Sequence, residues 1–255
     1  MQVVRNIGHI KEQRRAGRRM TAFGFTALAL AFVMVFWQRQ QPALILVSYA
    51  LMLFGYIFFS AGIQTVGKYV SNKSKKRSDE YLDRALDRLS DRYTIIHYAK
   101  LGKRVVDHLL VHNNGVLVLT VREVDGKINV NGRRWRRQGN LLRRFLNYGA
   151  PQLGNPTLDN EADVAAVKEA LGAAGLPQQV EGAVVFTHPQ AEVSGDSPLD
   201  VLGIDEVADH ARQLANSDEF PTLTAKDRLA IVSTLSSGSE LEQASARPER
   251  RKRAA

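Results

Sequence analysis

Two stretches near the start of the chain consist almost entirely of apolar and small residues and contain no ionisable side chain. They run from Met20 to Trp37 and from Ala43 to Ile63, and only the segment 38–42 separates them. Each is about as long as the ~20 residues that a helix needs to cross ~30 Å of hydrocarbon. Leu, Val, Phe, Ala and Met occupy every face, whereas a soluble core helix usually keeps a polar stripe. The pattern predicts a transmembrane helical hairpin over residues 20–63 (helices 20–37 and 43–63), with a buried hairpin of a soluble protein as the alternative.

Basic residues flank both predicted spans. The first span is preceded by Arg5, Lys11, Arg14, Arg15, Arg18 and Arg19, and the second is followed by Lys68, Lys73, Lys75, Lys76 and Arg77. The connecting loop contains only Arg39. The positive-inside rule therefore predicts a multi-pass cell membrane protein with both termini cytoplasmic. On this interpretation residues 1–19 form a basic cytoplasmic N-terminus, residues 64–77 form a basic linker, and anionic lipid is a partner.

The periodicity of the remaining chain predicts one α/β domain over residues 78–236. Helical spacing covers 78–92, and strand-length runs follow at 94–99, 105–112, 116–121 and 127–130. Turn signals such as Asn113-Asn114-Gly115 separate these runs, so we expect an antiparallel meander. Helices at 160–174, 205–214 and 225–235 and a strand at 180–187 come next, and 189–198 is expected to be a loop. The late strand follows a helix and is expected beside the third strand. The polar, basic residues 237–255 predict a disordered tail.

Composition excludes several kinds of chemistry. The chain has 255 residues, a formal charge of +9 and no cysteine, so a disulfide framework, a cysteine nucleophile and a thiolate metal site are absent. The sequence has no glycine-rich dinucleotide loop, Walker loop or serine elbow, and no histidine pair at metal-binding spacing. Nothing therefore implies a small-molecule substrate. The lack of cysteine also fits the reducing cytoplasm.

One arrangement of residues carries candidate chemistry. Asp107-His108 stands on a predicted strand, Gly115 follows in a turn, and the apolar run Val116–Val121 ends at Arg122. Together with Glu80, Gly126, Trp135, Asn155-Pro156 and Phe186, this order resembles the nuclease-related domain (NERD) family, a branch of the restriction-endonuclease-like PD-(D/E)XK superfamily. The resemblance runs from about Glu80 to about Ala211. It implies an α/β fold with a restriction-endonuclease-like mixed sheet flanked by helices, here preceded by the transmembrane hairpin.

The same resemblance implies a degenerate catalytic site. In the family an aspartate and a Glu-x-Lys on the next strand form the nuclease centre, and its carboxylates hold a divalent cation that activates water. This chain keeps Asp107 but has Thr120 at the glutamate position and Arg122 at the lysine position. Threonine lacks a carboxylate and arginine stays protonated. We therefore expect a vestigial site of Asp107, Arg122 and Glu80, with the side chains of 107, 120 and 122 converging and no metal or cofactor bound.

Two alternatives remain open at this site. An active nuclease would use Asp107 with a displaced carboxylate, Glu80 or Asp125, and would need Mg²⁺. Asp107 is otherwise an ordinary strand-end acid that pairs with Arg104 or Arg122.

An arginine cluster forms the second candidate site. It comprises Arg133, Arg134, Arg136, Arg137, Arg143 and Arg144 around Trp135. Guanidinium groups bind phosphates in a forked geometry, and an aromatic ring stacks on a base, which favours nucleic acid. Anionic lipid headgroups and a solvated hairpin with Trp135 packed on the core are the alternatives.

These observations predict a membrane-anchored, catalytically impaired module that binds nucleic acid or a protein partner. A purely structural protein whose hairpin oligomerises is a third hypothesis. It has little support, because small residues cluster only around Gly55 and Ala61-Gly62.

Overall fold

The computed structural model describes residues 1–37, 44–71, 76–138, 151–177, 179–217 and 221–244. They form two compact units. One contains the described residues between 10 and 77, and the other contains residues 1–9, 78–138 and the described residues from 152 to 244.

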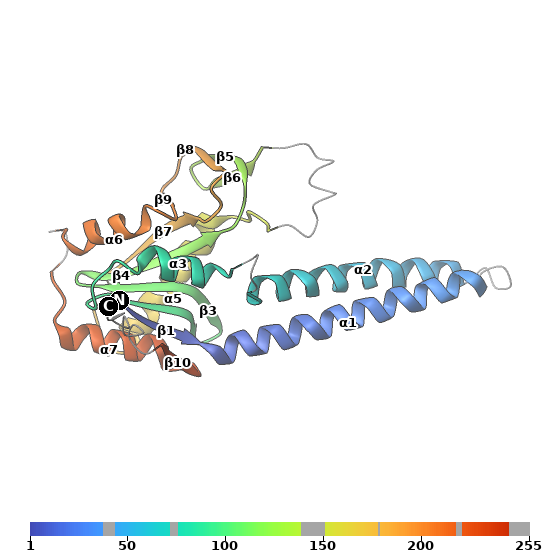
Figure 1. Ribbon diagram of the computed structural model, residues 1–255, viewed down its shortest axis with the longest axis horizontal. Coiled ribbons are helices and arrows are strands. Elements are labelled where there is room, and N and C mark those ends of the chain that lie inside the picture. The colour runs from blue at the N-terminus through green and yellow to red at the C-terminus, as the bar shows by residue number, and fades with distance from the viewer. Residues whose placement is uncertain (38–43, 72–75, 139–150, 178, 218–220, 245–255) are drawn as a thin grey trace, which may run out of the picture. The chain divides into compact units, whose positions relative to one another are not determined.

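The first unit contains two long helices, α1 (Ile7–Trp37) and α2 (Leu44–Tyr69) (Figure 1). Both are long and apolar enough to cross a membrane, and only 17 % of each apolar window is buried. A core helix of a soluble protein would be mostly buried, so the predicted hairpin is confirmed. Helix α2 continues to Tyr69, which makes the first residues of the expected linker 64–77 helical. The turn 38–42, Lys73 and Lys75 lie outside the described residues.

Most buried positions in the two helices recur every seven residues. They are Ile10, Gly17, Gly24 and Ala31 on α1, and Ser48, Gly55, Gly62 and Tyr69 on α2, and Ala27 on α1 is buried between two of them. A Cβ on Gly24 would lie 2.3 Å from the backbone nitrogen of Phe59, and one on Gly62 would lie 2.4 Å from that of Thr21. The helices thus approach closely through a seven-residue repeat of mostly small residues, as in a coiled-coil seam. Sequence analysis missed this repeat, and the small residues serve contacts within the hairpin.

Seven strands of the described chain form the main sheet of the second unit, in the order β10-β1-β2-β3-β4-β7-β9. Their bounds are β1 Gln2–Asn6, β2 Thr94–Leu101, β3 Arg104–His112, β4 Gly115–Arg122, β7 Val180–Phe186, β9 Asp200–Gly203 and β10 Leu241–Ala244. Strands β2, β3 and β4 pair antiparallel. Strand β7 pairs parallel with β4, so the predicted position of the late strand beside the third strand is confirmed.

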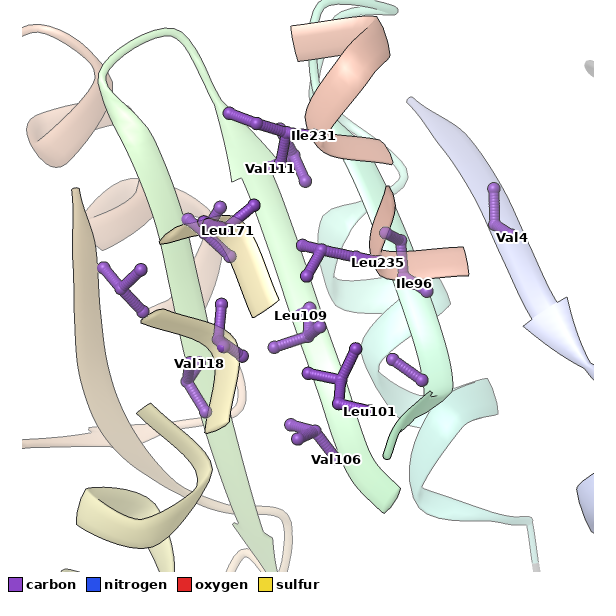
Figure 2. Packing of buried hydrophobic residues seen from close by; sticks show 14 of the residues in the cluster. Val4, Ile96, Leu101, Val106, Leu109, Val111, Val118, Leu171, Ile231 and Leu235 are labelled. Atoms are coloured by element: carbon purple, nitrogen blue, oxygen red, sulfur yellow. The ribbon is translucent and has the colours of Figure 1, made fainter. Parts of the chain in front are cut away.

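Helices cover both faces of this sheet. Side chains alternate along a strand, so Leu109 and Val118 face one side while Leu110 and Leu117 face the other. Helices α5 (Pro156–Ala173) and α7 (Ala225–Ser236) pack on the first face (Figure 2). Helices α3 (Ser78–Leu86) and α6 (Val207–Ala215) pack on the second. The predicted mixed α/β fold is therefore confirmed. Helix α3 ends at Leu86, short of the expected Arg92.

The first residues of the chain belong to this sheet. Sequence analysis treats 1–19 only as a basic terminus, but Gln2–Asn6 form β1, which pairs parallel with β2 and antiparallel with β10. Val4 is buried in the core. The Asn6 side chain donates to the Tyr98 carbonyl at 3.0 Å and accepts from the His9 amide at 3.1 Å, at the start of α1. Residues before the first apolar helix thus complete the sheet of the domain that follows the second. Strand β10 lies likewise within the expected disordered tail, of which residues 245–255 lie outside the described part.

A second sheet contains β5 (Gly126–Asn131), β6 (Arg134–Arg137) and β8 (Ala191–Asp196), in the order β6-β5-β8. The expectation that β5 is the fourth strand of the main meander is therefore wrong. The expected loop at 189–198 is also wrong, because β8 pairs parallel with β5. Strand β8 lies at an edge and is mostly exposed, so it lacks the apolar alternation by which a strand is predicted.

Candidate functional site

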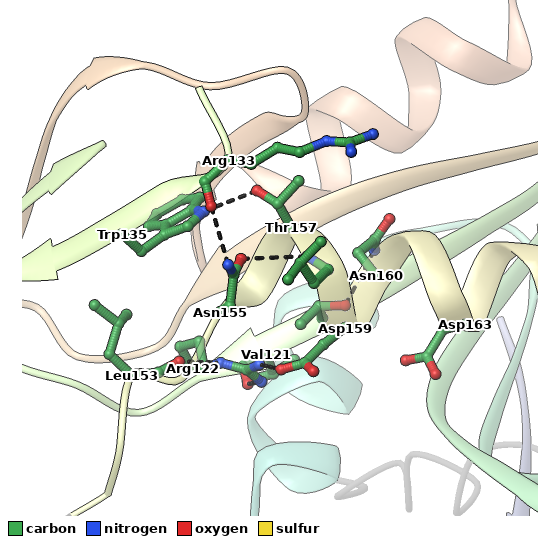
Figure 3. Close-up of polar contacts among 12 residues, drawn as sticks. Val121, Arg122, Arg133, Trp135, Leu153, Asn155, Thr157, Asp159, Asn160 and Asp163 are labelled. Atoms are coloured by element: carbon green, nitrogen blue, oxygen red, sulfur yellow. Dashed lines mark hydrogen bonds and ion pairs between the residues drawn. The ribbon is translucent and has the colours of Figure 1, made fainter. Parts of the chain in front are cut away.

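The side chains at positions 120 and 122 share one face of the main sheet. Side chains repeat with a period of two along β4, so Thr120 and Arg122 lie with Val118 on the face covered by α5. Contacts with α5 agree: the Asn160 amide donates to the Thr120 hydroxyl at 3.0 Å, and Arg122 forms an ion pair with Asp159 (Figure 3). The convergence of Asp107 with these two positions stays a prediction.

The start of α5 is fixed by local interactions. Asn155 caps the helix, its side chain accepting from the Leu158 amide at 3.3 Å, and Pro156 occupies the first turn. The side-chain amide of Asn155 also donates to the Arg133 carbonyl at 3.0 Å. Side-chain capping satisfies an otherwise orphan backbone donor, and proline suits the first turn because it has no N–H to lose. These contacts place the first acidic residues of α5 over the ends of β3 and β4.

Three acidic residues in the first turns of α5 each pair with an arginine from another element. The pairs are Asp159 with Arg122, Glu161 with Arg133 at 2.9 Å, and Asp163 with Arg104. The Arg122 guanidinium also donates to the Leu153 carbonyl at 2.8 Å, and Arg104 donates to the Asp159 carbonyl at 3.2 Å. Arginine thus holds α5 against the strand ends with several donors per side chain. Sequence analysis gave no role to Asp163, although Asp159 and Asp163 stand four residues apart on one helix face.

Burial and the negative charge of Asp107 contribute to the raised pKa of Asp163, which lies on α5. Burial is the main cause that raises the pKa of Asp163, and the hydrogen bond and charge of Arg104 oppose it. The negative charges of Asp107 and Asp159 raise that pKa further. The charge of Asp107 therefore acts on a carboxyl group of α5.

The two acids considered for a displaced carboxylate lie elsewhere. Glu80 belongs to α3, whose Leu82 and Leu86 pack on the opposite face of the sheet. Asp125 pairs with Arg137 beside the second sheet. Glu80 thus lies on the face of the sheet opposite to that of Thr120 and Arg122.

The residues of this site do not fit the family's divalent cation. The position of the second carboxylate carries a hydroxyl that accepts from Asn160, and the lysine position carries a guanidinium paired with Asp159. Across the part of the chain that the structure describes, no group of three or more His, Asp or Glu side chains is arranged to hold a metal ion. Hard cations need several free oxygen ligands, and here the nearby carboxylates already neutralise arginines.

His108 follows Asp107 on β3 and points to the other face. Its Nδ1 lies 2.8 Å from Nδ1 of His97, whose Nε2 lies 2.8 Å from Asp83. Its Nε2 lies 3.3 Å from the Ser78 hydroxyl. Both rings are buried, and burial of polar rings requires such partners. The histidine of the Asp-His pair thus serves a buried network that joins β2, β3 and α3.

The arginine cluster divides into paired and exposed members. Trp135 is only 9 % exposed, its Nε1 donates to the Thr157 hydroxyl at 2.8 Å, and its ring centroid lies 6.1 Å from that of Phe186. The ring is therefore a core residue and cannot stack on a base. Arg133 pairs with Glu161 and Arg137 with Asp125, whereas Arg134 and Arg136 are exposed. Arg143 and Arg144 lie outside the described residues.

The exposed arginines share a face of the second sheet with other polar side chains. Arg136 stands opposite Asn129, and Arg134 opposite Asn131. On the far side of β5, Asn129 stands opposite Ser194, and Lys127 pairs with Glu192 at 4.0 Å. Residues two apart in a strand point the same way, so these side chains form one continuous outer surface. We call the exposed set Lys127, Asn129, Asn131, Arg134, Arg136, Glu192, Ser194 and Asp196 the polar sheet face.

A mixed sheet with helices on both faces defines a mixed α/β domain, and the chain also carries two membrane-length helices. The sequence profile of the nuclease-related domain family (NERD) matches residues 72–187, so this part of the chain is similar to that family. The matched segment contains Asp107, Thr120, Arg122 and Trp135. No curated protein and no solved structure matches the chain.

Proposed function

We propose that this protein is a membrane-anchored, cytoplasm-facing nuclease-related domain that has lost catalysis and binds nucleic acid at the membrane surface. The observation that carries the first part is the state of the former catalytic positions. Thr120 is held by Asn160, and Arg122 is held by Asp159. Both positions are engaged in attaching α5 to the sheet, so the chemistry that the family performs there has no free carboxylate or lysine.

The proposed membrane topology is supported by the pairing of β1 with β2. Strand β1 precedes α1, β2 follows α2, and the two strands pair directly. This pairing supports a hairpin whose two ends lie on the same side of the membrane. The cations that flank the apolar helices assign that side to the cytoplasm.

The polar sheet face supports nucleic-acid binding. It presents Arg134 and Arg136 beside Asn129 and Asn131, whereas Lys127 is paired with Glu192 and Asp196 stands opposite Asn131. Guanidinium groups bind phosphate oxygens without reading sequence, whereas Trp135 is buried and takes no part. Contacts of this kind predict sequence-independent affinity whose logarithm falls with log salt at a slope of about −0.7 to −0.9 per phosphate contact.

Two other functions remain as outcomes of the test. An active metal-dependent nuclease would use Asp107 with a displaced carboxylate, and Asp163 of α5 is a candidate beside Glu80 and Asp125. A scaffold for a protein partner would leave nucleic acid unbound.

The test uses the full chain reconstituted in lipid nanodiscs, because β1 is part of the domain. Plasmid and RNA cleavage are measured with Mg²⁺ and Mn²⁺, and binding of a fluorescent oligonucleotide is measured by anisotropy over a range of salt. We expect no cleavage and a binding that weakens steeply with salt. Arg134→Gln with Arg136→Gln should weaken binding about tenfold or more and reduce the magnitude of the salt slope by roughly two phosphate contacts. Arg137→Gln is the matched control, since Arg137 is paired with Asp125.

Each alternative has its own result. Cleavage that disappears in both Asp107→Asn and Asp163→Asn would establish the active nuclease and overturn the proposal. Cleavage that persists in both variants would indicate a contaminating nuclease. Absent or salt-independent binding would exclude nucleic acid as the partner and would favour the function as a scaffold for a protein.

A further inference from the structure

The basic residues of α1 lie on one side of the helix. Gly17 faces α2, since a Cβ there would lie 2.9 Å from the Val66 side chain. A helix turns by about 100° per residue, so relative to Gly17 the cations lie at roughly 60° to 200°. They are Lys11, Arg14, Arg15, Arg18 and Arg19. They share an arc of about 140°, and the remaining circumference of this stretch carries Glu12, Gln13, Ala16 and Met20.

These cations differ in what they contact. Arg14 donates to the Tyr69 carbonyl at 2.6 Å, so it fastens α1 to α2. Arg15, Arg18 and Arg19 are exposed. Among the described residues, no carboxylate forms an ion pair with these three guanidinium groups. They are therefore cations without a counter-charge, grouped beside a membrane-length apolar segment.

The basic residues of α1 differ in their distance along the helix axis from the start of the apolar section. The apolar section of α1 begins at Met20, and a helix rises 1.5 Å per residue, so Arg18 and Arg19 lie about 2–3 Å and Arg15 about 8 Å beyond its edge. Lys11 lies about 14 Å beyond it. The headgroup layer of one leaflet is about 5–8 Å thick. Arg15, Arg18 and Arg19 thus reach the lipid phosphates, and Lys11 lies outside the layer.

We infer that Arg15, Arg18 and Arg19 form a binding surface for the phosphate groups of anionic phospholipids on one side of the hairpin. The inference rests on the proposed insertion of the hairpin in a membrane. Guanidinium groups bind phosphate in a bidentate geometry and remain charged at every physiological pH. The depth of the surface selects lipid over nucleic acid, because a polyanion approaching from water meets the outer residues first. The surface enriches anionic lipid beside this domain.

The absence of cysteine makes a direct test feasible. A single Ala22→Cys carries a bimane fluorophore, because Ala22 is exposed on the same side of α1 at about 140° from Gly17 and lies inside the apolar section. The full chain is reconstituted in vesicles that contain either brominated phosphatidylglycerol or brominated phosphatidylcholine, each diluted in unbrominated phosphatidylcholine. Quenching by each brominated lipid reports how often that lipid occupies the surface.

We expect quenching to give a relative association of phosphatidylglycerol over phosphatidylcholine of about three- to fivefold, decreasing with added salt because exposed charges are screened. Arg15→Gln with Arg18→Gln and Arg19→Gln should bring this ratio close to one. Arg18→Gln should lower the ratio, whereas Lys11→Gln removes the same charge outside the headgroup layer and should leave it unchanged.

The possible failures are distinct. A ratio of one in the parent chain, or an equal loss in Lys11→Gln and Arg18→Gln, would overturn the lipid surface. Quenching by brominated phosphatidylcholine reports insertion itself. Its absence would overturn the membrane anchor, and its persistence in the triple variant shows that the hairpin still inserts.

Discussion

The amide nitrogen of Asn160 donates a 3.0 Å hydrogen bond to the hydroxyl of Thr120. Asn160 is fully buried, and its amide also donates to the Val118 carbonyl at 3.1 Å. A buried polar group without partners would cost about 1–3 kcal/mol, so these contacts fix α5 against β4. Thr120 thus contributes to the packing of a helix on the sheet.

The same asparagine explains a glycine on β7. A Cβ on Gly182 would lie 1.8 Å from Oδ1 of Asn160. We expect Gly182→Ala to destabilise the domain by about 1–3 kcal/mol, because no flexible neighbour can give way. The penalty should largely disappear in an Asn160→Ala background, where the clashing oxygen is absent. Thermal unfolding of the four variants of this double-mutant cycle measures the coupling. Additive effects would show that the two residues do not meet.

Trp135 should matter for stability and not for nucleic-acid binding. Trp135→Phe keeps a ring against Phe186 but loses the hydrogen bond to Thr157. We expect a loss of about 1–2 kcal/mol in unfolding free energy, with oligonucleotide affinity unchanged within about twofold. Denaturant titration and anisotropy on one preparation check both. A large loss of affinity at unchanged stability would instead make Trp135 a base-stacking residue.

Strand β1 should be necessary for a stable domain. Val4→Asp places a carboxylate in the core beside β2 and β10, at a cost of several kcal/mol. We expect the domain to become sensitive to protease and to lose its cooperative thermal transition. Gln2→Asp is the control, because Gln2 is exposed on the same strand. Equal resistance of Val4→Asp and the parent chain would mean that β1 does not contribute to the sheet.

The glycine contacts between α1 and α2 should determine how closely the helices pack. Gly24→Leu pushes a side chain into the backbone of Phe59, whereas a Cβ on Gly67 would have no described atom within 4 Å, so this position should accept leucine. The rings of Phe23 and Phe58 lie 5.2 Å apart, so cysteines at these positions should be joined by a short bifunctional thiol crosslinker. We expect Gly24→Leu to reduce this crosslink several-fold and Gly67→Leu to preserve it. The opposite ranking would place the helix contact on another face.

Acid should destabilise the domain through His112. Burial, with a smaller contribution from the charge of His210, lowers the pKa of His112 from 6.5 to about 4. The unfolded chain therefore binds the proton more readily, and stability is lost as pH falls from about 6.5 toward 4. At pH 5 this single group accounts for about 2 kcal/mol relative to neutral pH. Thermal unfolding between pH 7 and 5 should show a shallower dependence in His112→Gln. An unchanged slope would assign the acid sensitivity to other groups.

Elements with strong local patterns were predictable from the sequence. The two apolar helices follow from long runs without charge. Strands β2, β3, β4 and β7 follow from short apolar runs that are buried on both faces. The N-terminus of α7 was also predictable, because Thr224 and Asp227 form a capping box that the sequence displays. In each case the residues that decide the structure are neighbours along the chain.

Elements whose partners are distant in sequence were not predictable in this way. Strand β1 has too few residues to signal a strand, and only pairing with β2 and β10 gives it a place. Strand β8 is exposed and depends on β5. The acidic residues of α5 do not indicate a site in the sequence, because their role depends on ion pairs with arginines from other parts of the chain.

The sequence by itself determined that the chain has two membrane-length helices, a mixed α/β domain, and threonine and arginine at positions 120 and 122. These properties depend on residue type and local periodicity. The tertiary structure alone decided that α5 covers the sheet face of Thr120 and Arg122, that Trp135 is buried and that residues before α1 join the sheet after α2. Those outcomes depend on which distant surfaces meet, because burial and ion pairing are properties of contacts and not of single positions.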